Sequence, residues 1–346
     1  MALAIECPLP VMGHKQVVIG HGSGGRLSAQ LIAEMFLPAF DNEILRRMDD
    51  QAVLNLDRAR VAFTTDSFVV TPIFFPGGNI GDLAINGTVN DLAMSGAQPL
   101  YLSAAFIIEE GFPMDDLRRV VESMALAAKT AGVTIVTGDT KVVNKGCADK
   151  LFITTAGVGL VPEGVRISAA NAKPGDAIIL SGTIGDHGMA VMSQREGLDF
   201  EGALTSDTRA LYRLVRAMLD AGEIHALRDP TRGGLAATLC EIAKTSGAGI
   251  DIDACAVPVR ETVKGACEVL GLDPMFVANE GKLVAFVAAG DAQRILDAMR
   301  ALPEGREAAI IGRVTDRHPS MTIVRTEIGG SRVLDLPFNE QLPRIC

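Results

Sequence analysis

The pattern of strands and helices expected from this sequence of 346 residues runs once to Pro162 and then begins again. Runs of β-branched and aromatic residues predict strands, and apolar residues at helical spacing predict helices. In the first half these signals fall at 61–70, 80–95, 99–108, 133–137 and 151–160, with a further helix opened by Pro113. In the second half they fall at 177–181, 186–196, 207–220, 233–246, 249–253, 261–270, 283–288, 291–302, 308–314 and 321–326. Strands do not alternate strictly with helices, which favours two α+β domains over one doubly wound parallel sheet.

The chain therefore divides into four expected segments. They are an N-terminal glycine-loop segment at 1–40, α+β domains at 41–162 and 163–332, and a tail at 333–346. The tail contains LPFNEQLPRIC, with two prolines and no periodicity, and ends in Cys346. These features predict an extended, mobile segment.

Composition excludes several classes of protein. The net charge is −10, from 32 basic and 42 acidic residues, and no run of Lys or Arg reverses it locally. There is no Trp and there are two Tyr, so nucleic acid is not an expected partner. No basic segment precedes an apolar stretch and no apolar run is long enough to cross a bilayer, which predicts a cytoplasmic protein. The six cysteines form no C-x-x-C pair, which argues against a zinc site.

Aspartates beside small residues recur at the expected ends of strands and starts of helices. They are Asp49, Asp50, Asp66, Asp82, Asp91, Asp139 and Asp229. Mg²⁺ prefers hard oxygen ligands, and small neighbours let a phosphate approach the backbone. For any single aspartate a helix cap or a turn is the commoner role. Together, however, they favour a metal–nucleotide site, mostly in the first half of the chain.

A glycine-rich loop, GHGSGG at 20–25, lies between a strand expected at 16–20 and a helix expected at 26–37. Its spacing matches the dinucleotide fingerprint, but the following FDNEILRRMDD provides no second strand ending in an acidic residue. We therefore interpret the loop as a flexible segment that folds over a ligand. Its candidate contacts are Gly22, Gly24 and Gly25, with His21 a weaker candidate. No G-x-x-x-x-G-K-[ST] motif is present, so the chain is not a P-loop enzyme.

Three further motifs place charged side chains beside small residues. Thr137–Lys141 follows a short strand and predicts a tight turn, either at the surface or holding Lys141 against a phosphate. Asp229 opens an apolar helix, as its cap or beside N–H groups that face an anion. Glu280 precedes a buried strand, as a general base or a loop carboxylate. The histidines interpreted as structural are His187, His225 and His318.

Together these segments resemble the superfamily of aminoimidazole ribonucleotide synthetase, selenophosphate synthetase and thiamine monophosphate kinase, over nearly the whole chain. The resemblance implies a two-domain α+β, PurM-like (AIR synthase-like) fold whose N-domain sheets pair into a barrel across a homodimer. It also implies that ATP and Mg²⁺ bind between the domains, mainly on the first. The implied metal ligands are Asp50, Asp91 and Asp229, with Asp49 an alternative to Asp50. The implied nucleotide contacts are Asp66, Asn86, Gly138, Asp139 and Thr140.

Within this superfamily, HGSGGRLS, NGTVNDLAMSGA, VTGDTKVV, DPTRGGLA, NEGKL and the final PRIC resemble the HypE family of hydrogenase-maturation carbamoyl dehydratases. This resemblance implies that a HypF-family carbamoyltransferase places a carboxamide on Cys346 and that ATP drives its dehydration to a thiocyanate. A HypC–HypD complex would accept the cyanide for the iron of a NiFe hydrogenase. Lys141 and Glu280 would remove the amide protons, and Asp82 would belong to the same apparatus.

Two other functions stay open at this point. A synthetase or kinase that acts on a free small molecule would keep its turnover without Cys346. A nucleotide-gated scaffold for metallocofactor assembly would bind ATP without Mg-dependent release of phosphate.

Overall fold

The structure, a computed structural model, describes residues 25–31, 33–34, 43–56, 59–198, 204–326, 328–336, 342 and 344–346. The strand expected at 16–20 lies outside these residues, as do His21, Gly22 and Gly24. No helix in the described part of the chain is both long and apolar enough to cross a membrane.

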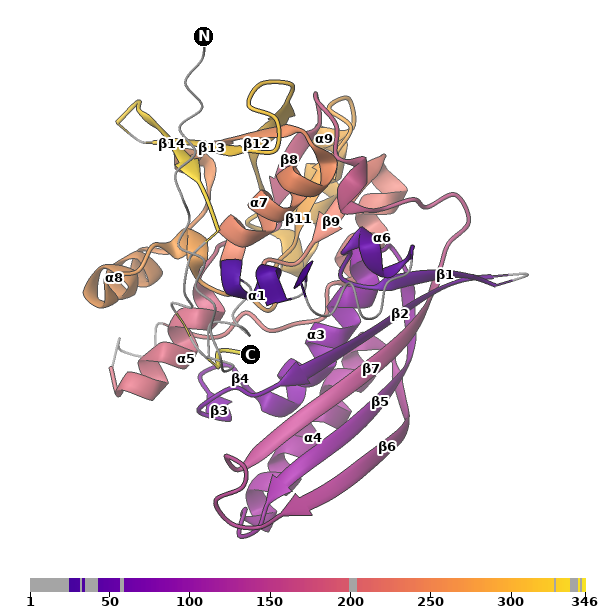
Figure 1. Cartoon of the computed structure of the whole chain (residues 1–346), viewed down its shortest axis with the longest axis vertical. Helices are drawn as coiled ribbons and strands as arrows, with labels where there is room; N and C mark the ends of the chain where they lie inside the picture. The colour runs from indigo at the N-terminus through magenta and orange to yellow at the C-terminus, as the bar shows by residue number, and fades with distance from the viewer. Residues whose placement is uncertain are drawn as a thin grey trace.

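The first half of the chain folds into a five-stranded sheet with two long helices on one face (Figure 1). Its elements are α1 (Arg26–Leu31), η3 (Leu45–Arg47), β1 (Ala52–Leu56), β2 (Ala59–Phe68), β3 (Phe74–Phe75), β4 (Gly78–Asn79), α3 (Ile80–Met94), β5 (Gln98–Glu109), α4 (Met114–Ala131), β6 (Thr134–Val143) and β7 (Leu151–Val161). The strand order is β1-β2-β7-β5-β6, and β5 and β6 are its one parallel pair.

Helix α3 is buried on nearly all sides and lies between the sheet, α4 and the second half of the chain. A capping box closes its start: the Asn79 side chain accepts from the N–H of Gly81 at 2.8 Å, and Asp82 accepts from the N–H of Asn79 at 2.6 Å. Gly87 lets the helix lie close on β2, since a Cβ there would come 2.9 Å from the Phe68 ring. A helix in this position can present side chains to both domains.

Helix α4 is amphipathic and covers the sheet beside α3. It begins after Pro113 with Asp115 and Asp116 in its first turn, where negative charge suits the helix dipole. It ends at Gly132, whose left-handed backbone (φ 74°) favours glycine.

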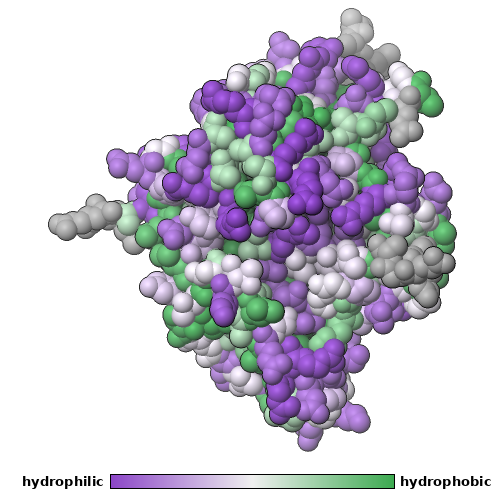
Figure 2. All heavy atoms as spheres, turned by 180° about the vertical axis from the view of Figure 1, so that it is seen from behind, coloured by the Kyte–Doolittle hydropathy of each residue, from purple (hydrophilic) through white to green (hydrophobic). Residues whose placement is uncertain are grey.

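On the face of the molecule shown in Figure 2, hydrophilic residues cover most of the surface and apolar residues form small groups between them.

The opposite face of this sheet exposes apolar side chains. Phe63, Tyr101, Ile107 and Leu160, from β2, β5 and β7, are each more than two-fifths exposed. Phe63 and Tyr101 are both aligned with Val158 of β7, so they share that face. Exposed apolar faces of this kind mark interaction surfaces.

The second half forms a seven-stranded sheet with helices on both faces (Figure 1). Its elements are η4 (Ala169–Asn171), β8 (Ala177–Leu180), α5 (Asp186–Glu196), α6 (Tyr212–Ala221), β9 (Ile224–Arg228), α7 (Gly234–Ser246), β10 (Gly249–Asp253), η5 (Ala254–Ala256), α8 (Glu261–Leu270), η6 (Pro274–Phe276), β11 (Val284–Val287), α9 (Ala292–Arg300), η7 (Pro303–Gly305), β12 (Ala309–Thr315), β13 (Thr322–Arg325) and β14 (Ser331–Leu334). The strand order is β14-β13-β10-β12-β8-β11-β9, with α7 packed on one face and α6 and α9 on the other.

Most of the expected elements are present, and the differences have physical causes. The strands β1, β9 and β14 were not expected: each is short, and pairing with a neighbour supplies the order that its own sequence does not. The helix expected from 207 begins at Tyr212, because the backbone of Arg209 and Leu211 before it bonds to the Asn90 side chain of α3. Asp229 does not cap the helix that follows, whose N-cap is Gly233.

The prediction of a tight turn at Thr137–Lys141 is wrong. These residues lie within β6, an exposed edge strand that pairs with β5 from Thr134 to Val143. The glycine of the motif permits this pairing, because a Cβ on Gly138 would come 2.2 Å from the carbonyl oxygen of Ala104. Pairing along the whole strand overrides the turn propensity of Gly-Asp-Thr.

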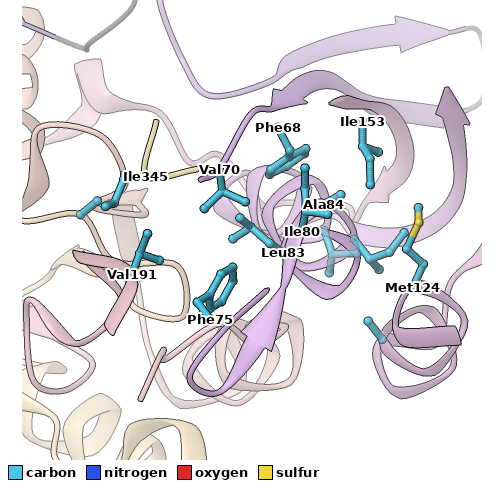
Figure 3. Packing of buried hydrophobic residues seen from close by; sticks show 14 of the residues in the cluster. Phe68, Val70, Phe75, Ile80, Leu83, Ala84, Met124, Ile153, Val191 and Ile345 are labelled. Atoms are coloured by element: carbon cyan, nitrogen blue, oxygen red, sulfur yellow. The ribbon is translucent and has the colours of Figure 1, made fainter. Parts of the chain in front are cut away.

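The end of the chain differs from the expected extended tail. Residues 331–334 form β14, and Leu342 and Ile345 are buried, at 6% and 2% exposed, in an apolar cluster that the first domain shares with α5 and α8. Figure 3 shows Ile345 beside Val191 and near Val70. Burial of these apolar side chains stabilises the docked end, which its prolines did not predict.

Candidate active site

Five carboxylates from the two domains face one another where α3 crosses between the sheets. Asp50 precedes β1, Asp66 lies on β2, Asp91 on α3, Asp229 after β9 and Glu280 before β11. Asp229 and Glu280 are buried, and the others are half-buried. The group is assembled from residues as far apart in the chain as 50 and 280.

Burial and mutual repulsion make these groups reluctant to ionise. Burial, opposed by Arg228, raises the pKa of Asp50 to about 6, and burial together with Asp50 raises the pKa of Asp229 to about 8. Burial raises the pKa of Asp91 well above its ordinary value, and Asp229, Asp66 and Asp50 add to the rise. The pKa of Glu280 rises for the same reasons, and its Oε1 has no hydrogen-bond partner. A bound cation would relieve this repulsion.

The donor set fits Mg²⁺, which takes oxygen ligands. Within the described ranges no three or more His, Cys, Asp or Glu side chains stand close enough around one point to hold an ion by themselves. Mg²⁺ does not need such a cage, because it usually retains waters and shares one or two carboxylates with phosphate oxygens. Asp50, Asp91 and Asp229 are the candidate ligands for Mg²⁺ in this cluster.

Asp49 and Asp50 have different surroundings in the structure. Both carboxylate oxygens of Asp49 accept from Ser168 Oγ at 3.0 Å, and one also accepts from the N–H of Ala169 at 3.1 Å. Asp49 is thus used to begin η4 in the second domain. Asp50 is the member of the pair that faces the other carboxylates.

Two arginines that the sequence reasoning missed complete the electrostatics. Arg228 Nε lies 2.9 Å from Asp50, and its Nη2 lies 3.2 Å from Glu241. The positive charge of Arg232 opposes the rise in the pKa of Asp66 and of Glu280. The signal was present, because both arginines flank Asp229 in LRDPTRGG. Guanidinium groups in this position suit an anion such as phosphate.

Two further residues fix the backbone at Glu280. Asn90 of α3 donates from Nδ2 to the carbonyls of Arg209 (3.0 Å) and Glu280 (3.3 Å), and its Oδ1 accepts from the N–H of Leu211 (2.8 Å). Asp207 accepts from the N–H of Glu280 at 3.0 Å and lies 3.0 Å from Lys282 Nζ. Asn90 also joins the two domains next to Asp91, whose carboxylate accepts from Thr64 Oγ1 at 2.8 Å.

Several predicted site residues lie elsewhere. Asp82 is held in the capping box of α3 and accepts from Ser123 Oγ at 3.2 Å. Asn86 donates to Thr208 Oγ1 at 3.3 Å, a contact between the domains. Gly25 is buried immediately before α1.

The structure does not bring Lys141 to Glu280 within one chain. Lys141 lies on β6 with its side chain 70% exposed and 2.8 Å from Asp139. Gly138, Thr140 and Lys141 all lie on β6, which is three strand spacings away from β2, the strand that carries Asp66. At about 4.8 Å per spacing, the two strands are about 14 Å apart. The nucleotide contacts predicted on β6 and on β2 are therefore also apart.

Cys346 docks just beyond the end of β2, the strand that carries Asp66. Its carbonyl accepts from the N–H of Val69 at 3.1 Å, and Val69 follows Asp66 by three residues. Cys346 is half-buried and packs against the core of the first domain. Among the histidines expected to be structural, His225 contacts Asp176 at 2.8 Å, His318 has a left-handed backbone (φ 53°), and His187 contacts the end of the chain at Ile345.

Comparison with known proteins agrees with this architecture. Residues 48–161 match the N-terminal domain and residues 173–324 the C-terminal domain of the AIR synthase related proteins. These matches confirm the two-domain α+β, PurM-like fold.

Whole-chain comparisons are more specific. The carbamoyl dehydratase HypE of Cupriavidus necator is 56% identical over 99% of this chain and 98% of its own length. A crystal structure of HypE in complex with ATP is 50% identical, with a TM-score of 0.81 over 96% of this chain and 100% of that one. HypE in a HypE–HypF complex is 52% identical, with a TM-score of 0.85 over 89% and 99%. The chain therefore belongs to the AIR synthase-related proteins and, among them, to the HypE family of carbamoyl dehydratases.

Proposed function

We propose that this chain dehydrates an S-carboxamide carried on its own Cys346, using Mg-ATP at the cluster of Asp50, Asp66, Asp91, Asp229 and Glu280. The product is a thiocyanate, which supplies cyanide for the iron of a NiFe hydrogenase. The observation that carries the proposal is the docking of Cys346 at the end of β2, three residues from Asp66. The relatives named carbamoyl dehydratase, and the ATP complex of one of them, support it.

The reaction balances as the removal of one water. The carboxamide oxygen attacks the γ-phosphorus of ATP, and the bond between that phosphorus and ADP breaks. The carbon–oxygen bond then breaks, phosphate leaves with the electron pair, and the nitrogen loses both protons, which leaves S–C≡N. Phosphorylation is needed because an amide oxygen is otherwise a poor leaving group. Bound Mg²⁺ supplies neutralisation of charge on the transferring phosphoryl group.

The chain's own residues bind, orient and accept protons. Asp50, Asp91 and Asp229 hold the metal, while Arg228 fixes Asp50 through the ion pair at 2.9 Å. Glu280 is the base: its raised pKa suits proton transfer from a weakly acidic amide N–H. Burial keeps water away from that carboxyl group.

Lys141 enters this site from a second copy of the chain. It lies on an exposed edge strand, next to a sheet face that exposes Phe63, Tyr101 and Leu160. A homodimer that pairs these sheets, as the barrel implied by the family would, buries this apolar surface and moves β6 of one copy toward its partner. Asp139, Thr140 and Gly138 travel with Lys141 and contact the nucleotide there.

The partners follow from the chemistry. A carbamoyltransferase of the HypF family loads Cys346, consistent with the HypE–HypF complex among the similar structures. A HypC–HypD complex takes the cyanide. Asp82 contributes indirectly, by holding the start of the helix that carries Asp91.

Intact-mass spectrometry of the carbamoylated protein before and after Mg-ATP tests this function. We expect a loss of the mass of one water, mapped to Cys346 and absent in Cys346→Ala. Cys255→Ala is the matched control, because Cys255 is an exposed cysteine of the other domain. Consumption of ATP without a change of mass at Cys346 would favour a synthetase acting on a free small molecule. ATP binding without release of phosphate would favour the assembly scaffold.

A further inference from the structure

Two side chains of α5 reach the last residues of the chain. His187, in the first turn, lies with Nε2 2.8 Å from the carbonyl of Ile345 and with Nδ1 2.8 Å from Ser206 Oγ. A carbonyl only accepts, so Nε2 carries the proton, and Nδ1 accepts from the Ser206 hydroxyl. Ser206 Oγ in turn accepts from the N–H of Thr208 at 3.1 Å. Every donor in this buried row has a partner when His187 is neutral, and burial lowers the pKa of His187 accordingly.

Arg195, in the last turn of α5, contacts the same segment. Its Nη2 donates to the carbonyl of Arg344 at 2.7 Å and to that of Thr71 at 2.5 Å, and its Nε donates to Thr71 at 2.8 Å. One guanidinium group therefore joins the second domain, the end of the chain and the segment after β2. Bonds from a charged donor are about twice as strong as neutral ones.

The first domain supplies the opposite side of the dock. The N–H groups of Val69 and Thr71 donate to the carbonyls of Cys346 and Arg344, each at 3.1 Å, in an antiparallel register. The Arg344 side chain donates from Nε to the Val69 carbonyl at 2.9 Å, and its Nη1 lies 2.5 Å from the Asp149 carboxylate. Ile345, between these bonds, is buried beside Val191 and Val70 (Figure 3).

We propose that His187 and Arg195 are positioning residues that hold Cys346 at the end of β2, the strand that carries Asp66, during dehydration. Their contacts go to main-chain carbonyls of Arg344 and Ile345 and not to the cysteine sulfur. The same contacts therefore fix the backbone whether the sulfur is free, carries the carboxamide or carries the thiocyanate. This inference rests on the proposed function, because it assigns the docked end of the chain to the ATP-using step.

The same contacts set how readily the end of the chain leaves its dock. Loading by a transferase and delivery of cyanide both require Cys346 to be accessible, so these bonds must break in each cycle. Loss of one of them shifts the ratio of docked to released chain by about tenfold. His187 and Arg195 therefore set the fraction of molecules in which Cys346 is docked and the fraction in which it is accessible to partner proteins.

Alkylation of Cys346 and single-turnover dehydration, measured on the same full-length variants, test the inference. The variants are Arg195→Ala and His187→Leu, which remove the donors, and Arg195→Lys and His187→Gln, which retain one. Arg216→Ala is the control, since Arg216 pairs with Asp220 on the exposed side of α6. The carbamoylated fraction is measured by intact mass before Mg-ATP is added, so that a defect in loading is separated from a defect in dehydration.

We expect Arg195→Ala and His187→Leu to accelerate alkylation of Cys346 and to slow dehydration per loaded molecule. Because both readouts report one docked-to-released ratio, the two factors should multiply to about tenfold. ATP affinity should stay within about twofold of wild type, and the conservative variants should recover most of both effects. If alkylation of Cys346 is unchanged in folded variants, or if Arg216→Ala has the same effect, the inference is wrong. If His187→Leu does not fold, the alkylation and dehydration rates of Arg195→Ala, Arg195→Lys and His187→Gln still test the inference.

Failure of the proposed function is distinguishable. In that case the wild-type protein itself loses no water at Cys346. The alkylation rates would then still report whether His187 and Arg195 hold the end of the chain, and a null result there would overturn the docking role separately.

Discussion

At the scale of single residues, the carboxylates of the acidic cluster lower the stability of the metal-free fold. Burial raises the pKa of Asp50 to about 6, and burial together with the neighbouring charge of Asp50 raises that of Asp229 to about 8, so ionisation of these carboxylates costs stability when no cation is bound. Functional groups of this kind commonly cost stability. Replacing one of them by a neutral isostere should therefore stabilise the metal-free protein while removing its response to the metal.

Asp229→Asn is the sharpest form of this prediction. In wild type the raised pKa stabilises the fold fully below about pH 3.9, the unfolded value, and this contribution is lost as pH rises through about 8. Without divalent ions, wild type should lose stability relative to Asp229→Asn between about pH 5 and pH 8. Melting temperatures across that range measure the difference, and adding Mg-ATP should raise the wild-type value only. Parallel pH profiles for the two proteins would contradict the assigned cluster.

Residue types predicted part of this site, and tertiary contacts decided the rest. The sequence predicted strand ends and helix starts for these aspartates, whereas Asp91 lies near the end of α3, and Asp50 and Asp229 lie beside β1 and β9, which were not expected. Arg228 was missed although it lies next to Asp229 in the sequence, because a single arginine gives no periodic signal and its partner Asp50 lies in the other domain. Asp82 has the same local sequence features as the others, yet it caps a helix.

At the scale of elements, β6 shows how pairing overrides local propensity. Gly-Asp-Thr is typical of a turn, but the segment is a strand because β5 pairs with it from Thr137 to Val143 without interruption. Helices with clear periodicity, such as α3 and α7, were predicted almost to their ends. The short strands β9 and β14 were missed because their order comes from neighbouring strands.

Gly138→Ala should weaken this edge of the sheet. Its Cβ would meet the Ala104 carbonyl at 2.2 Å, so the strands must separate, at a cost of about 1–3 kcal/mol. Gly265→Ala is the control: its Cβ meets nothing within 4 Å on α8, and alanine should stabilise the helix by about 0.5–1 kcal/mol. Chemical denaturation of the two variants measures both signs. Equal stability of Gly138→Ala and wild type would show that β5 and β6 are not held this closely.

At the scale of the whole molecule, the site draws on both domains and on the end of the chain. Helix α3 places Asp91 at the centre, while α5 holds Ile345 and Arg344 from the other side. The docking of the last residues was not predictable from their prolines, because it depends on the segment after β2, where Val69 lies 275 residues before Arg344. Lys141 and Glu280 remain apart in one chain, and the exposed sheet face beside Lys141 indicates where a second copy would complete the site.

Mixing two inactive variants tests that completion. Lys141→Ala and Glu280→Gln should each be nearly inactive alone. If Lys141 acts in the partner's site, a mixed dimer contains one site with both defects and one site with neither. Random exchange of subunits makes about half the dimers mixed, so dehydration should recover to about a quarter of the wild-type rate. A mixture of Glu280→Gln with Asp229→Asn should recover nothing, because both residues belong to the same chain's cluster. No recovery in the first mixture, with subunit exchange verified by native mass spectrometry, would place Lys141 and Glu280 in one chain's site and require β6 to move toward the cluster.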